Sequence, residues 1–101
     1  MYFGIKGIWE IIMENRFLKE FVVLAETCSF QESAEKLYIS LSSLSKHVKK
    51  IEKELGVSLF DRTSRSVKLS ECGVIFYEYA RQIIKLYDEC TSILNEHRID
   101  N

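Results

Sequence analysis

The segment SLSSLSKHVKKIEKELG, residues 40–56, decides the fold class, because its first half is open to two interpretations. Its first six positions are all Leu or Ser, and their near-alternation resembles that of a half-buried strand. This pattern stops at Lys46. On a helical wheel the segment instead separates into two faces. The apolar face holds Leu44, Val48, Ile51 and Leu55, and the basic face with small hydroxyls holds Ser42, Ser45, Lys46, Lys49 and Lys53. We therefore predict a helix over 41–55, capped by Ser40 and ended by Gly56.

The segments on either side predict a winged helix-turn-helix. Residues 15–26 carry a wide apolar stripe on one helix, and Ser29 with Glu32 forms a capping box before a short helix over 30–37. Residues 58–70 hold two β-prone pieces around a polar turn with two arginines, which predicts a β-hairpin. A hairpin directly after a basic helix is the wing of this fold. The predicted fold is mainly α, with three helices and a small β-hairpin wing over 13–69.

A long linker or dimerisation helix is predicted within 70–101, from Ser70 to about His97. Its apolar residues are spaced alternately by four and three, as in the seam of a coiled coil. The seam residues are Phe76, Ala80, Ile83, Tyr87, Cys90 and Leu94. Such a seam is buried either against the chain's own domain or against a second copy. We expect a homodimer, because the stripe outlasts the core of one small domain.

Charge is distributed unevenly along the chain. The net charge of the 101 residues is −1, yet residues 38–68 hold seven basic and three acidic residues, a net of +4, between acidic flanks. A basic middle segment is typical of a domain that docks one face on a polyanion. A solvated charged helix face is the alternative.

Other function classes lack support in the sequence. The two histidines lie far apart, so we predict no catalytic site, no metal site and no cofactor, with His47 as a surface or backbone-facing residue. The three cysteines lack metal-ligand spacing, which favours reduced thiols in a cytoplasmic protein over redox sensing. No run approaches the roughly 20 apolar residues of a membrane span. Residues 1–12 are interpreted as an N-terminal extension.

Four segments together resemble the DNA-binding domain of the LysR-type transcriptional regulators. They are FLKEFVVLAE (17–26), CSFQESAEKLYIS (28–40), SLSKHVKKIEKELGVSLFDR (43–62) and VKLSECG (67–73). The resemblance implies a homodimer, or a tetramer in the full-length protein, that binds double-stranded operator DNA. It further implies that helix 41–55 enters the major groove, with the wing 59–69 on flanking backbone or minor groove. The rival hypothesis is a protein-interaction module, which would not show salt-sensitive binding of duplex DNA.

The resemblance also implies the site residues, position by position. They are Ser29, Gln31, Leu41, Ser42, Ser45, Lys46, Lys49, Lys50, Arg62, Thr63 and Arg65. Leu41 stands where the family commonly has Gln, so it either covers the core or touches a thymine methyl group. Gln31 replaces the usual Thr. Family members usually continue into an effector-binding domain. We expect this chain to be a fragment of such a protein, and a naturally short protein is the alternative.

Overall fold

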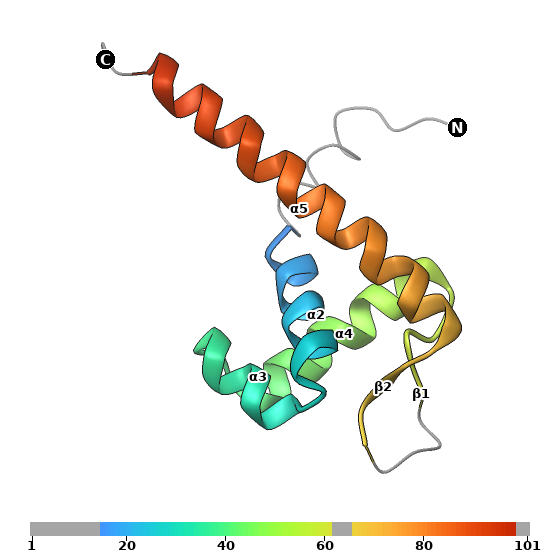
Figure 1. Cartoon of the computed structure of the whole chain (residues 1–101). Helices are drawn as coiled ribbons and strands as arrows, with labels where there is room; N and C mark the ends of the chain where they lie inside the picture. Colours follow the sequence, from blue (N-terminus) through green and yellow to red (C-terminus); the bar gives the residue numbers. More distant parts are fainter. Residues whose placement is uncertain (1–14, 62–65, 99–101) are drawn as a thin grey trace.

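The computed structural model describes residues 15–61 and 66–98 as helices joined to a small hairpin (Figure 1). The elements are α2 (Asn15–Thr27), α3 (Phe30–Leu37), α4 (Leu41–Leu55), β1 (Phe60–Asp61), β2 (Lys68–Leu69) and α5 (Glu71–His97). This architecture confirms the predicted fold class, a mainly α winged helix-turn-helix followed by a long helix.

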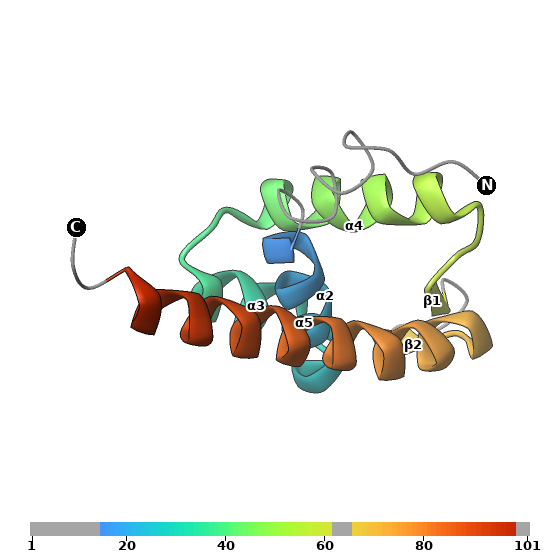
Figure 2. The same cartoon turned by 90° about the horizontal axis from the view of Figure 1, so that it is seen from above.

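Helix α2 is the centre of the arrangement. Seen from above, α5 crosses α2, and α4 lies to one side of α5, near the start of α2 (Figure 2); α2 contacts both of them. The strands β1 and β2 pair antiparallel, with Phe60 opposite Leu69 and Asp61 opposite Lys68. The hairpin projects from the place where α4 ends and α5 begins, and the far end of α5 extends beyond the other helices (Figure 1).

The core forms around Phe21 of α2. Its ring meets Phe60 of β1 and Phe76 of α5 edge to face, with centroids 5.6 and 5.0 Å apart. Leu44 and Leu59 are also fully buried. Burying each such side chain contributes about 1.5–3 kcal/mol to stability. Because Phe21 contacts both Phe60 and Phe76, this one residue of α2 joins the wing and the long helix to the rest of the domain.

Serine caps begin three of the helices, as predicted. The Oγ atoms of Ser29, Ser40 and Ser70 each accept a hydrogen bond from the backbone N–H three residues later, at 3.0, 3.0 and 2.9 Å. The predicted capping box at Ser29 is only half formed, because its own N–H donates to Thr27 Oγ1 at 3.2 Å. Gly56 ends α4 with a φ of 73°, in the left-handed region where glycine is unstrained.

The structure corrects part of the predicted α5 seam. Ala80 is fully buried in the chain's own core and Phe76 packs against Phe21, so the first half of that seam covers α2. A neighbouring stripe on α5 is exposed instead, and we call it the exposed seam. It consists of Cys72, Tyr79, Ile83, Leu86, Cys90 and Ile93. Its spacing of seven, four, three, four and three is again that of a coiled coil. Tyr87 is half-buried and Leu94 is exposed beside it.

Candidate DNA-binding surface

Helix α4 presents the two faces that the sequence predicts. Leu44, Val48 and Ile51 are buried against α2 and its neighbours, at 6% exposure or less. On the other side Lys46 and Lys49 are exposed. Ser42 and Lys53 are exposed on this side as well, and Ser45 is half-buried. The helix therefore turns a row of ammonium and hydroxyl groups outward, both of which can donate hydrogen bonds.

Leu41 lies on the outer side of the first turn of α4. Its side chain is 52% exposed, so it does not serve chiefly as a core residue. Of the two alternatives left by the sequence, the structure disfavours the core role. An exposed leucine at this position can offer an apolar surface to a methyl group of a ligand.

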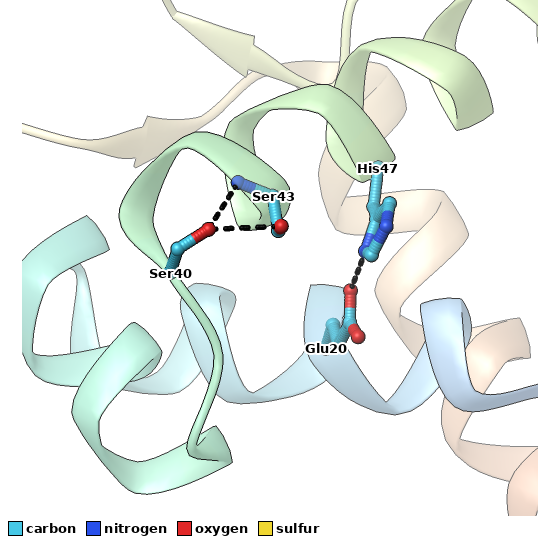
Figure 3. A network of polar contacts seen from close by, with 4 residues as sticks. All are labelled: Glu20, Ser40, Ser43 and His47. Atoms are coloured by element: carbon cyan, nitrogen blue, oxygen red, sulfur yellow. Dashed lines mark hydrogen bonds and ion pairs between the residues drawn. The ribbon is translucent and has the colours of Figure 1, made fainter.

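The N-terminus of α4 is open to an anion. Ser40 Oγ accepts from the Ser43 backbone N–H and donates to Ser43 Oγ at 2.8 Å (Figure 3). The Ser42 hydroxyl lies 3.2 Å from the same Ser40 oxygen. The first turn of α4 carries no acidic residue, so the partial positive charge of the helix end is not neutralised within that turn.

Helix α3 brings two predicted site residues to its start. Gln31 is exposed, whereas Ser29 is half-buried and its hydroxyl caps the helix. Behind them Ser33 is fully buried and shares a 2.6 Å hydrogen bond with Thr27 Oγ1. The Ser29 hydroxyl is thus engaged within the protein, while the Gln31 amide faces solvent.

Lys50 differs from the other lysines of α4. Its Nζ lies 3.7 Å from Glu54 Oε1, one helical turn further on. Exposed pairs of this kind contribute only about 0.3–0.5 kcal/mol, so this pair adds little to the stability of α4. It does lower the net positive charge along that edge of α4.

The structure corrects the prediction for His47. This residue is neither a free surface group nor backbone-facing: its Nδ1 lies 2.6 Å from Glu20 Oε1 of α2 (Figure 3). The ring also stacks on Phe17 with centroids 4.1 Å apart. The sequence held one signal for this contact, because Glu20 falls on the apolar side of its helix, near Leu24 on the wheel.

Glu52 was also missed by the sequence analysis. Its Oε2 accepts from the Leu59 backbone N–H at 2.8 Å and from the Ser58 hydroxyl at 3.4 Å. On the other side of this junction Ser70 Oγ donates to the Ser58 carbonyl at 2.7 Å. The end of α4, the base of the wing and the start of α5 therefore form one hydrogen-bonded junction.

The wing tip carries three of the predicted DNA contacts. Arg62, Thr63 and Arg65 lie outside the described residues, and their assignment remains a prediction. Only the strands β1 and β2 on either side are described, near the end of α4 and the start of α5.

The fold and the surface together define a class of protein. A helix-turn-helix formed by α3 and α4, a basic outer face on the second helix and a β-hairpin wing are the parts of a winged helix-turn-helix DNA-binding domain. In the described part of the chain no group of three or more His, Cys, Asp or Glu residues could hold a metal ion.

The family follows from sequence comparison. Residues 16–74 match the model of the bacterial regulatory helix-turn-helix proteins of the lysR family. This match covers more than half of the chain, and the chain belongs to the LysR family. Its helix-turn-helix domain is of the kind that binds DNA sequence-specifically in transcription regulation.

Several relatives are similar to the chain over most of its length. A probable RuBisCO transcriptional regulator of Thalassiosira pseudonana is 39% identical over 79 residues, which cover 78% of this chain and 26% of the relative. The regulator BenM of Acinetobacter baylyi is 40% identical over 81 residues, covering 80% and 27%. The chain thus spans about a quarter of the length of these curated relatives.

A solved structure resembles the whole described fold. The crystal structure of the BenM DNA-binding domain in complex with benA site 1 DNA matches with a TM-score of 0.80 and 35% identity, covering 87% of this chain and 99% of that one. Among the residues described here, no helix combines the length and apolar character needed to cross a membrane.

Proposed function

We propose that the chain reads operator DNA for a LysR-type transcription regulator by placing α4 in the major groove. The observation that carries this proposal is the pair of opposed faces on α4, buried on one side and lined by Lys46, Lys49 and hydroxyl groups on the other. Lysine can donate to guanine O6 or N7, and serine can donate or accept at either kind of base pair. The similarity to the BenM domain in its DNA complex supports the same docking.

The neighbouring elements would supply the remaining contacts. Gln31 at the start of α3, with Lys49 and Lys50 on α4, is assigned to phosphates, which set the register but carry no sequence information. The wing, through Arg62, Thr63 and Arg65, is assigned to the flanking backbone or minor groove. An arginine there is attracted by the negative potential of a narrow A·T-rich groove.

We further propose a homodimer through α5. The exposed seam supports this, because Tyr79 and Leu86 are 62% and 65% exposed on a helix that extends beyond its own domain. A longer parent protein would add a domain that allows a tetramer. A dimer would present two copies of α4 to half-sites about one or more helical turns apart. A regulator of this kind acts in the cytoplasm.

Selection from a random pool of duplex DNA tests the function. The wild-type chain is expected to enrich a motif with two related halves, and to bind it more tightly than a scrambled duplex of the same composition. The rival hypothesis, a protein-interaction module with an incidental basic helix, predicts no enriched sequence. Absence of enrichment at low salt would therefore reject DNA reading by this chain.

A further inference from the structure

Glu20 stands out among the buried residues. In the described part of the chain it is the one charged side chain that is buried, at 5% exposure, in the middle of α2. Removing a carboxylate from water costs several kcal/mol unless a partner compensates for the loss. The partner is His47 Nδ1 of the recognition helix, which lies 2.6 Å from Glu20 Oε1, within hydrogen-bond distance.

The His47 ring is held in two ways. Its nitrogen meets Glu20, and one face stacks on Phe17 at an interplanar angle of 22°. Both contacts come from α2, so the ring is fixed to that helix although it belongs to α4; the contact with Glu20 is drawn in Figure 3. His47 directly follows Lys46, which lies on the outer face. A rotation of α4 that moves the His47 ring therefore also moves Lys46.

A second polar contact lies on the opposite flank of the same helix. On a wheel of about 100° per residue, His47 and Glu52 each lie roughly 70° from the middle of the buried face of α4, on opposite sides. Glu52 is bonded to the Leu59 backbone. Burial of Leu44, Val48 and Ile51 restricts the rotation of α4 about its own axis, but hydrogen bonds depend more steeply on geometry than apolar contacts do. The two flanking hydrogen bonds can fix that rotation.

We propose that Glu20 is a positioning residue for DNA reading, which sets the rotation of α4 through His47 and thereby the sequence specificity of the domain. Side chains extend about 5–6 Å from a helix axis, so a rotation of roughly 20° moves their tips by about 2 Å. Hydrogen bonds to base edges do not survive such a shift. Attraction between lysines and phosphates tolerates it. This inference rests on the proposed function.

The test compares two affinities for each variant of the whole chain. The probes are the duplex that the wild type enriches from a random pool and a scrambled duplex of the same composition. Glu20→Ala is expected to lower the ratio of the two affinities about tenfold, mainly by weaker binding of the enriched duplex. Binding of the scrambled duplex should change less than about twofold. Glu20→Gln, whose amide oxygen can still accept from Nδ1, is expected to keep most of the ratio.

The chain offers a matched control. Glu26, also on α2, accepts a 2.6 Å hydrogen bond from the Tyr77 hydroxyl of α5. Glu26→Ala therefore removes a bond of the same length that leads to α5 and not to the recognition helix. It should leave the affinity ratio unchanged. All variants are compared at a temperature where circular dichroism shows them fully folded, so that loss of folding is not mistaken for loss of specificity.

Each outcome decides between the possibilities. A ratio within about twofold of wild type for Glu20→Ala overturns the positioning role, and so does an equal loss for Glu26→Ala, which would indicate general destabilisation. If Glu20→Ala does not fold, two variants of His47 are compared instead. His47→Asn keeps a hydrogen-bond donor near the position of Nδ1 and should retain the affinity ratio. His47→Leu has no such donor and should lose it. A wild type that enriches no sequence refutes the proposed function itself, whereas an unchanged ratio refutes only this inference.

Discussion

The carbonyl oxygen of Leu59 faces Gly73 so closely that a Cβ atom on Gly73 would overlap it. Leu59 is at the base of the wing and Gly73 is in the first turn of α5, and the same carbonyl accepts from the Ser70 backbone N–H at 2.9 Å. The absence of a side chain at position 73 therefore allows the wing and the long helix to meet.

Gly73→Ala is expected to lower the free energy of unfolding by about 2 kcal/mol, as overpacking does elsewhere. Helix propensity alone would make the alanine variant about 1 kcal/mol more stable than the glycine protein. A lower free energy of unfolding therefore shows that the steric overlap outweighs helix propensity. Thermal or urea denaturation at one fixed protein concentration measures the change, because a dimer's stability depends on concentration. Glu78→Ala, exposed on the same helix, is the control and should stay within about 0.5 kcal/mol. A Gly73→Ala protein as stable as this control would contradict the close packing.

Local features of the fold were predictable from sequence. The serine caps at Ser29, Ser40 and Ser70 depend on groups only three residues apart, and the glycine that ends α4 depends on one residue's conformation. The two faces of α4 follow from helical periodicity alone. In each of these features the interacting groups lie within a few residues of one another in the sequence, so the predicted elements agree with the structure.

Features that depend on distant parts of the chain were missed. Glu20 and His47 are 27 residues apart. The place of Glu20 on the apolar side of its helix indicates that it is buried, but neither helix alone identifies His47 as its partner. The seam of α5 is a second case. Periodicity predicts an apolar stripe, but whether Ala80 or Tyr79 is the exposed residue depends on which side of α5 packs against α2. Phe21 of α2 meets Phe76 of α5, so the side of α5 that carries Phe76 faces α2. The exposed seam is therefore rotated by about 50° around the helix axis from the predicted seam, half of the 100° between successive residues.

Lys46→Ala is expected to weaken binding of the enriched duplex about tenfold, because it removes a donor from the base-facing row. Wild-type affinity should fall steeply with rising salt, and the loss caused by Lys46→Ala should be larger for the enriched duplex than for a scrambled duplex. Fluorescence anisotropy across a salt series measures both quantities. Lys85→Ala removes the same charge from an exposed position on α5, outside the helix-turn-helix, and should change neither. If the two variants bind alike, α4 does not face the DNA.

Leu86→Lys is expected to shift the chain from dimer to monomer at micromolar concentration, because it places a charge in the exposed seam. Sedimentation velocity provides the measurement. Val74→Lys is the matched control, since Val74 is 52% exposed on the same helix but lies away from the seam. A monomeric wild type, or equal effects of the two substitutions, would rule out pairing through this seam.

Tyr77→Phe is expected to change the response of the protein to alkaline pH. The pKa of Tyr77 is raised above its ordinary value of 10.0. The main cause is the hydrogen bond to Glu26, and desolvation is the second. The folded state therefore holds this proton more tightly than the unfolded state, and the resulting stability is present below pH 10.0 and is lost as pH rises through the higher folded pKa. Urea denaturation from neutral pH upward should show a smaller alkaline loss for Tyr77→Phe than for wild type, together with slightly lower stability at neutral pH. Parallel losses in the two proteins would show that the Tyr77–Glu26 bond does not form in solution.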